Sequence, residues 1–297
     1  MAKYRKNLKM IILFLFPAFI VYTIFEVIPV IGSFYFSFQD WPGIQGVPLK
    51  FVGLKNFITL FTYKEFIQSL KNVMVYVFLS VLTQVPIGFL LALVLSKLKR
   101  GVRFFKAAFF IPMVLPATAT ALLWGFIFFP NELGVLNNFL RTIGLGNLAR
   151  TWLVDDKVAL GCILVVTTWS SVGYYMIIGM AAIAGVPEDV IESGIMDGAT
   201  GLKNVFYIML PMIWESIKIS VVMVITGVLK IFDLIFIMTP GGGPGGATQV
   251  PALMMYNEAF KYNHYGVGSA ISTVIFVISI SFSLISLKLM SRERVEY

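Results

Sequence analysis

Six long apolar runs, separated by polar segments, dominate the sequence. Each run reaches the length of about 20 residues that an α-helix needs to cross a lipid bilayer. Backbone N–H and C=O groups find no partner in hydrocarbon, so the runs are predicted to be helices. The pattern therefore predicts an all-α polytopic membrane protein with a single transmembrane domain over residues 1–297. Its six transmembrane helices are expected at residues 10–38, 72–96, 104–129, 158–185, 212–239 and 265–289.

Composition supports this class. Of the 297 residues, 58% are hydrophobic and 13% are charged, with a mean hydropathy of +0.87, whereas soluble domains contain about 25% charged residues. The single cysteine, Cys162, excludes an intrachain disulfide and a cysteine-rich metal site. The net charge of +8 does not indicate nucleic-acid binding, because the basic residues flank the apolar runs instead of gathering on a soluble domain.

The basic residues also predict an orientation. With the N-terminus inside, thirteen Lys and Arg residues fall in inner segments and eight in the longer outer segments. The positive-inside rule then predicts that both termini and the segment 186–211 are cytoplasmic. The densest inner group consists of Lys97, Lys99, Arg100, Arg103 and Lys106.

The segment 186–211 interrupts the apolar pattern most strongly. It is predicted to form two short helices outside the bilayer. Gly198 suits the left-handed position that ends the first helix, and Thr200 could cap the second. Five charged side chains exclude a bilayer-spanning role, because each would cost a few kcal/mol at the bilayer centre; they are Glu188, Asp189, Glu192, Asp197 and Lys203.

Within this segment, Glu192-Ser193-Gly194, Asp197-Gly198-Ala199 and Ile208-Met209-Leu210-Pro211 resemble the cytoplasmic EAA loop of ABC-importer permeases. That pattern is Glu-Ala-Ala, then a glycine, then Ile-x-Leu-Pro. The chain departs from it at Ser193 and Gly194, where the family most often has alanine. The resemblance implies a coupling helix that docks on an ATPase subunit; an ordinary amphipathic connector is the alternative. The residues expected to support coupling are Glu192, Ser193, Gly194, Asp197, Gly198, Ala199, Leu210 and Pro211.

Three further segments resemble sugar-importer permeases of the maltose-permease type. They are Phe51–Phe57, the run from Lys230 to Pro244, and Tyr256–Ala270. This resemblance implies a bacterial or archaeal cell (inner) membrane and a sugar substrate. It also implies a second related permease subunit, two ATPase subunits and an extracytoplasmic sugar-binding protein as partners, besides membrane lipid.

Nucleotide binding is expected on those partners and not on this chain. The sequence contains no Gly-x-x-x-x-Gly-Lys-Ser/Thr motif. Gly241, Gly243 and Gly246 match G-x-G-x-x-G by spacing only, since no strand precedes them and Pro244 lies among them; a tight loop or a contact for an external partner is expected there. The chain is therefore expected to bind no cofactor, with ATP and Mg on the ATPase subunits, and no metal site is predicted.

Polar residues inside apolar runs are candidates for a translocation path. On the fourth run, Trp169, Ser170 and Tyr174 combine aromatic faces with hydroxyl groups, which suits a sugar. On the fifth, Lys230 and Asp233 are three residues apart and could pair on one helix face. Packing between helices is the alternative for both groups.

Two other classes of function are weighed against a sugar importer. A permease for a non-sugar solute keeps the coupling segment, and the sugar-type segments argue against it. A stand-alone secondary transporter is expected to show an inverted repeat with discontinuous spans, and the sequence shows neither. A membrane enzyme is disfavoured, because no pair of carboxylates and no nucleophile–base pair is recognisable.

Overall fold

The computed structural model describes residues 2–290, and side chains from Met10 onward except Ile11 and Ile12. The orientation predicted for the two termini falls outside the described part of the chain. So do the side chains of six basic residues on which that prediction rests: Lys3, Arg5, Lys6, Lys9, Arg292 and Arg294.

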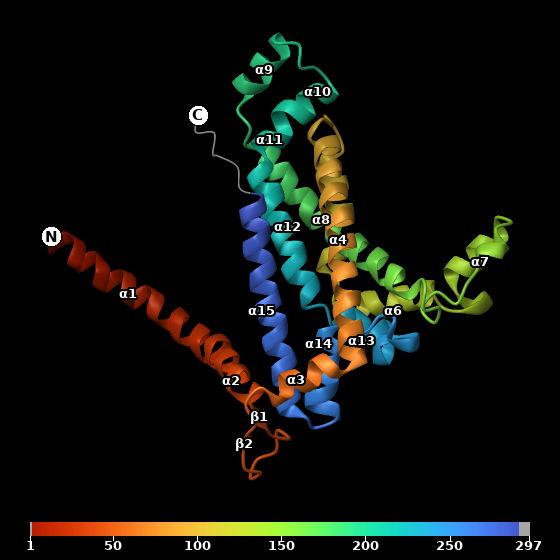
Figure 1. The fold of residues 1–297 in the computed structure, drawn as a ribbon. Helices are drawn as coiled ribbons and strands as arrows, with labels where there is room; N and C mark the ends of the chain where they lie inside the picture. The colour runs from red at the N-terminus through yellow and green to blue at the C-terminus, as the bar shows by residue number, and fades with distance from the viewer. Residues whose placement is uncertain (1, 291–297) are drawn as a thin grey trace. The chain divides into compact units, whose positions relative to one another are not determined.

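Helices make up nearly all of the regular structure, which confirms the all-α class (Figure 1). The described chain contains four helices long and apolar enough to cross a membrane, or up to six if each of two bent helix pairs is one span.

The chain divides into two compact units. The first comprises Met1–Tyr63 and Met254–Val274, and the second Lys64–Leu253 and Ile275–Tyr297. In the first unit, α1, a π-helical turn and α2 form one continuous helical stretch that covers the predicted range 10–38 except for its last residue. The elements that begin in this unit are α1 (Ala2–Tyr22), η1 (Thr23–Val27), α2 (Ile28–Ser37), β1 (Gln39–Asp40), β2 (Lys50–Phe51), α3 (Lys55–Thr62), η7 (Asn257–Lys261) and α15 (Tyr265–Leu289).

Asn56 organises the turn after α2. Its buried side-chain amide donates to the carbonyl oxygens of Ser37 and Gln39, both at 2.9 Å. The two strands pair antiparallel, with Gln39 opposite Phe51. The Phe51–Phe57 segment thus needs its asparagine for a structural reason, because the amide satisfies two backbone acceptors at the end of a helix.

In the second unit, α4 (Lys64–Ser96) and α8 (Ala159–Ala184) form the centre and run in the same direction. Their contacts show the direction, since Gly88 lies against Tyr175 and Ala92 against Gly179. Small residues let the two backbones approach closely, as is typical of helix pairs in membranes. The core continues onto α12 (Trp214–Leu229) through Val224, Ile225 and Val228.

Two of the predicted spans are broken, which corrects the prediction. Run 104–129 forms α5 (Val102–Val114) and α6 (Ala117–Ile127), bent by 99°. Pro116 lies at the break and accounts for it, because a proline disfavours helical geometry in the residue before it. Run 212–239 forms α12 and α13 (Asp233–Met238), separated by Lys230–Phe232. The expectation that the chain has no discontinuous span is therefore wrong.

The other predicted ranges agree more closely. Helix α8 lies within 158–185 and α15 coincides with 265–289, whereas α4 begins at Lys64, before the predicted residue 72. The remaining elements of the second unit are η2 (Asn131–Leu133), α7 (Val135–Thr142), η3 (Gly146–Leu148), α9 (Glu188–Met196), α10 (Leu202–Asn204), η4 (Val205–Met209), α11 (Leu210–Met212), η5 (Pro240–Gly242) and η6 (Pro244–Gly246), and α14 (Pro251–Tyr256) begins there.

The Gly/Pro segment after α13 is a tight loop, held against α4. The amide of Asn72 donates to the carbonyl oxygens of Gly246 at 2.8 Å and Gln249 at 2.9 Å. Gly242 has a φ of +91°, and a Cβ added there would lie 2.0 Å from Oε1 of Gln249. Packing of this kind agrees with the expectation of a tight loop.

Candidate coupling and translocation sites

The polar segment 186–211 folds into the two helical pieces predicted from its sequence. Helix α9 is the first, and α10, a π-helical turn and α11 form the second, a continuous stretch over Leu202–Met212. Glu188 and Asp189 lie in the first turn of α9, where the helix dipole favours negative charge. Figure 1 shows α9 and α10 together at one end of the second unit, beyond the long helices.

The end of α9 is fixed by backbone hydrogen bonds. The N–H of Gly198 donates to the carbonyl of Ile195 at 3.0 Å, and that of Ala199 to the carbonyl of Gly194 at 2.8 Å. Together with the φ of +82° at Gly198, these bonds form a Schellman motif. Asp197 is the residue between α9 and this glycine. Gly198 therefore ends the helix, as predicted, and the N–H of Ala199 completes the motif.

Thr200 does not cap the second helical piece. Gly201 precedes α10 instead, and no side chain caps that end. The prediction was wrong because the left-handed turn at Gly198 is followed by a second positive φ, of +57°, at Gly201. Two glycines, instead of one glycine and a threonine cap, reverse the chain between the helical pieces.

Gly194 brings the two pieces into contact. A Cβ added to Gly194 would lie 1.8 Å from Cδ1 of Ile208. The side chain of Ile208 therefore occupies the place where the family pattern has an alanine methyl group. Next to it, the hydroxyl of Ser193 donates to the carbonyl of Asp189 at 2.6 Å. Ser193 and Gly194 thus have structural roles that differ from those of two alanines.

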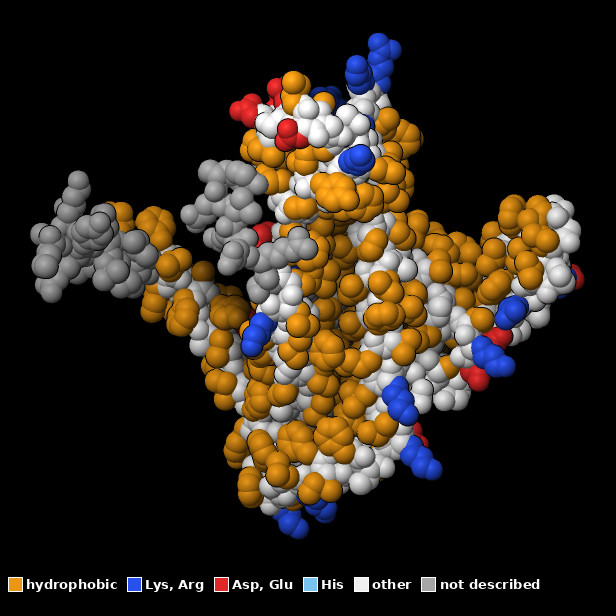
Figure 2. All heavy atoms as spheres, turned by 45° about the horizontal axis from the view of Figure 1, so that its top comes forward, with side chains coloured by type: hydrophobic (Ala, Val, Ile, Leu, Met, Phe, Trp, Pro, Cys, Tyr) orange, Lys and Arg blue, Asp and Glu red, His pale blue; other side chains and the backbone are white. Residues whose placement is uncertain are grey.

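The outer surface of this segment carries both charge and apolar area. Met196 is 87% exposed and Leu202 is 74% exposed. Glu192 is exposed and takes part in none of the ion pairs among the described residues. Figure 2 shows acidic side chains grouped on this end of the second unit. An apolar tip beside unpaired carboxylates can contact a partner protein of complementary shape and charge.

The segment joins α12 at a sharp bend. Leu210 and Pro211 belong to α11, and the chain turns by 70° at Ile213. Immediately after the bend, Lys218 and Glu215 form an ion pair of 2.7 Å, as expected of a packing pair. The indole N–H of Trp214 donates to the carbonyl of Met290 at 2.9 Å. The segment is therefore joined to the start of α12 through a single residue, Ile213.

The residues predicted on the fourth run lie on α8 with distinct surroundings. The rings of Trp169 and Trp124 meet edge to face at 5.5 Å. The Tyr174 hydroxyl lies 3.9 Å from Sδ of Met223 on α12. The hydroxyl of Ser170 is buried and has no hydrogen-bond partner among the described residues. A buried hydroxyl of this kind can form a hydrogen bond with a water molecule or a ligand.

Lys230 and Asp233 are not on one helix face, which corrects the prediction. Lys230 follows the last residue of α12, and Asp233 is the first residue of α13. Both side chains are exposed, and no ion pair between them occurs in the described structure. The helix is broken between them, so a spacing of three residues does not place the two side chains on one helix face.

Sequence analysis missed Trp124 on α6. Its indole N–H is buried without a hydrogen-bond partner in the described chain, and its ring lies 5.2 Å from that of Phe128. Trp124 on α6 and Ser170 on α8 therefore each have a buried polar group without a partner among the described residues. A tryptophan within an apolar run was the only available signal, and it does not distinguish a lining residue from a packing residue.

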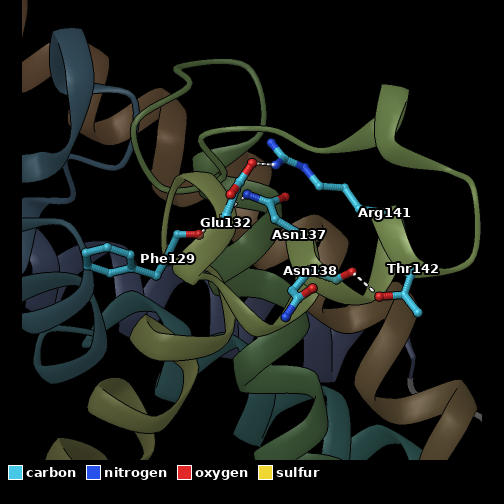
Figure 3. Close-up of polar contacts among 6 residues, drawn as sticks. All are labelled: Phe129, Glu132, Asn137, Asn138, Arg141 and Thr142. Carbon is cyan, nitrogen blue, oxygen red and sulfur yellow. Dashed lines mark hydrogen bonds and ion pairs between the residues drawn. The ribbon is translucent and has the colours of Figure 1, made fainter.

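Asn137 was also missed, in the segment between α6 and α8 (Figure 3). Its side chain is 1% exposed. Its amide nitrogen donates to the carbonyls of Arg150 at 2.9 Å and Phe129 at 3.5 Å, and its oxygen accepts from the indole N–H of Trp152 at 2.8 Å. Arg141 and Glu132 form an ion pair nearby. One asparagine therefore fixes a segment that its sequence presents only as a polar loop.

Comparisons with known proteins agree with this architecture. The family described as binding-protein-dependent transport system inner membrane component matches residues 84–297, which include α8, α9 and α12. In the crystal structure of a bacterial alginate ABC transporter with an alginate pentasaccharide-bound periplasmic protein, one chain has a TM-score of 0.83 to this chain. The match covers 97% of this chain and 96% of that one at 24% identity, which shows a shared fold.

Two relatives extend the agreement to nearly the whole sequence. The probable ABC transporter permease protein YurN of Bacillus subtilis is 38% identical over 279 residues, 93% of this chain and 94% of that protein. The trehalose/maltose transport system permease protein MalF of Thermococcus litoralis is 29% identical over 287 residues, 96% of this chain and 95% of that protein. The chain therefore belongs to the family of inner membrane components of binding-protein-dependent transport systems.

Proposed function

We propose that this chain is the membrane-spanning permease subunit of an ATP-driven, binding-protein-dependent sugar importer. The observation that carries the proposal is the coupling segment, whose EAA-like glycine ends α9 in a Schellman motif within the range matched by the family. The similarity to a trehalose/maltose permease over 96% of the chain supports a sugar as the substrate. Di- and oligosaccharides or glycerol phosphates are the proposed class.

The proposed complex contains a second related permease, two ATPase subunits and an extracytoplasmic sugar-binding protein. The ATPase subunits hold ATP and Mg, and α9 docks on one of them. When ATP closes the ATPase pair, α9 moves with it, and the bend at Ile213 passes the motion to α12. The short connection between α8 and α9 passes the same motion to α8, which is the fourth span. The ATPase subunit can shift the equilibrium between two conformations of the permease only as far as its affinities for those conformations differ.

The proposed sugar path runs beside α8 and the breaks in the third and fifth runs. Trp169, Tyr174 and Trp124 supply aromatic faces, and Ser170 supplies a buried hydroxyl without a partner in the described chain. Lys230 and Asp233, both exposed at the break after α12, are proposed to meet sugar hydroxyls or water. Sugars need aromatic faces for their C–H surfaces and polar groups for orientation.

Reconstitution tests this function. The chain alone in liposomes is expected to give no ATP hydrolysis and no solute uptake. Addition of the ATPase subunits, the second permease and the binding protein is expected to give ATP-dependent uptake of a sugar. Saturable, ATP-independent uptake by the isolated chain would instead establish a secondary transporter. An ATP-dependent complex that transports amino acids and no sugar would establish the non-sugar permease.

The proposed orientation has its own test. The segment 186–211 and residues 97–106 are expected on the cytoplasmic side, and residues 241–246 on the outer side. In a variant with Cys162 replaced, a cysteine introduced at Gly245 should react with an impermeant thiol reagent added outside the cell. One introduced at Gly101 should not react, and the reverse labelling would overturn the orientation.

A further inference from the structure

The turn between α4 and α5 carries the densest positive charge of the chain. Helix α4 ends at Ser96 and α5 begins at Val102, and Gly101 between them has a φ of +78°. Five cations lie within residues 97–106, which we call the basic turn: Lys97, Lys99, Arg100, Arg103 and Lys106. Figure 2 shows Lys and Arg side chains near the end of α4, at the same end of the second unit as the acidic side chains of α9.

No carboxylate of the described structure neutralises these cations. All five side chains are exposed, and none belongs to an ion pair among the described residues. The sequence has no Asp or Glu between Glu65 and Glu132, so α4 beyond its first turn, α5 and α6 contribute none. The acidic group on α9 lies at the same end of the unit and still forms no ion pair with the basic turn. The positive field of the turn is therefore available to an external anion.

Exposed apolar side chains are interleaved with the cations. Leu98 is 40% exposed, Phe104 is 70% exposed and Phe105 is 40% exposed. The rings of the two phenylalanines lie 5.5 Å apart, edge to face. Lys and Arg can extend their apolar stems along such a surface while their charged ends reach the water. Cations with adjacent aromatic side chains suit the boundary between headgroups and acyl chains.

The position of the turn favours lipid over a protein partner. Both flanking helices are apolar and reach the turn without an intervening polar domain, so the cations lie at the depth of lipid phosphates when these helices cross the bilayer. Five exposed cations spread over ten residues match a fluid layer of many phosphates better than they match a single phosphate. Clusters of four to eight Lys or Arg beside a membrane helix attract anionic lipid in this way.

We propose that the basic turn binds the headgroups of anionic phospholipids in the cytoplasmic leaflet. The choice of leaflet rests on the orientation under Proposed function, whereas lipid binding itself does not. The bound headgroups hold the α4–α5 corner at the membrane surface. Because α5 packs on α8 through Gly173, an anchored α5 gives α8 a fixed neighbour while α9 moves.

Lipid selectivity of the full chain in vesicles tests this binding. The probes are spin-labelled phosphatidylglycerol and spin-labelled phosphatidylcholine in mixed vesicles of the two lipids. Wild-type protein is expected to enrich the phosphatidylglycerol probe in its immobilised lipid fraction, and salt should reduce the enrichment. The variant Lys97→Gln/Lys99→Gln/Arg100→Gln should lower the relative association constant, by at most about fivefold for each cation removed.

The matched control is Lys50→Gln/Lys55→Gln/Lys64→Gln, which removes three exposed cations elsewhere in the chain and should retain the selectivity. Equal selectivity in the two triple variants would overturn the proposal. Selectivity of the wild type that does not depend on salt would also overturn it, and that measurement does not require any variant to fold. Competition by free inorganic phosphate at millimolar concentration would indicate a phosphate site and not a lipid surface. Retained selectivity with lost assembly onto the ATPase subunits would assign the turn to a protein contact.

Discussion

The carbonyl oxygen of Phe109 on α5 lies directly over the Cα of Gly173 on α8. A Cβ added to Gly173 would lie 1.9 Å from that oxygen and 2.5 Å from the carbonyl carbon. The contact joins two backbones, so no side chain can turn aside to make room. Close approach of this kind, with a Cα–H facing a carbonyl, recurs where helices cross. Gly173 therefore fixes where α5 crosses α8.

Gly173→Ala is expected to destabilise the protein by about 1–3 kcal/mol, because the methyl group forces the two backbones apart. The matched control is Gly161→Ala on the same helix, since a Cβ there meets nothing within 4 Å. That control should leave the stability unchanged or raise it by up to about 1 kcal/mol through helix propensity. Thermal unfolding of the purified variants measures both. Equal melting temperatures of the two variants would show that α5 does not pack closely against Gly173.

Gly194 and Ile208 are expected to be energetically coupled. Gly194→Ala alone forces the Ile208 side chain to another rotamer, at a cost of about 0.5–1.5 kcal/mol. Ile208→Val shortens that side chain and should relieve much of this cost. A double-mutant cycle measured by unfolding should therefore give a favourable coupling of at least about 0.5 kcal/mol. Strict additivity of the two changes would mean that the helical pieces of the segment do not pack as described.

Asn72 is expected to hold the Gly/Pro loop. Asn72→Ala leaves the carbonyls of Gly246 and Gln249 without their side-chain donor, at a cost of about 1–3 kcal/mol. Lys71→Ala, at the exposed neighbouring position, is the control and should change stability by less than about 0.5 kcal/mol. Limited proteolysis at residues 240–246 reports the loop directly. Unchanged cleavage in the Asn72 variant would contradict this role.

Lys230 and Asp233 are expected to act independently. Because the helix ends between them, Lys230→Gln and Asp233→Asn should change stability additively, within about 0.5 kcal/mol. If both line the sugar path, each variant should lower sugar transport per assembled complex, as should Trp169→Ala and Tyr174→Phe. Trp124→Phe keeps an aromatic ring and removes the N–H, which tests that donor alone. Normal transport per complex in all of these variants would place the sugar elsewhere.

The sequence was sufficient for features that depend on local rules. Apolar length predicted α8 and α15 almost to the residue, and the glycine at position 198 predicted the end of α9. Resemblance to known permeases indicated the family before any contact was known. These features follow from hydropathy, backbone conformation and motif spacing, all of which are encoded within a short stretch.

Features that depend on contacts between distant segments could not be predicted. An apolar run gives the same hydropathy whether it is straight or bent, so the breaks at Pro116 and after Leu229 escaped notice and Lys230 was wrongly paired with Asp233. The roles of Asn72 and Asn137 depend on carbonyl groups that other segments bring to them. The need for glycine at position 173 depends on Phe109 of α5, which lies more than sixty residues earlier in the chain.

In the proposed function, α9 docks on an ATPase subunit and couples the state of that subunit to the spans. Met196→Asp tests it most directly, because Met196 is 87% exposed at the tip of α9 and the change should disturb no internal contact. Leu133→Asp is the control, at a position 82% exposed in another segment of the second unit. The measurement is sugar-stimulated ATP hydrolysis by the reconstituted complex, alongside binding of sugar by the separate binding protein.

Met196→Asp is expected to lower the stimulated hydrolysis and to weaken retention of the ATPase subunits. Leu133→Asp should retain both, and the binding protein should bind sugar equally in either case. Wild-type hydrolysis and full retention of the ATPase subunits with Met196→Asp, and likewise with Glu192→Lys, would show that α9 does not dock on an ATPase subunit.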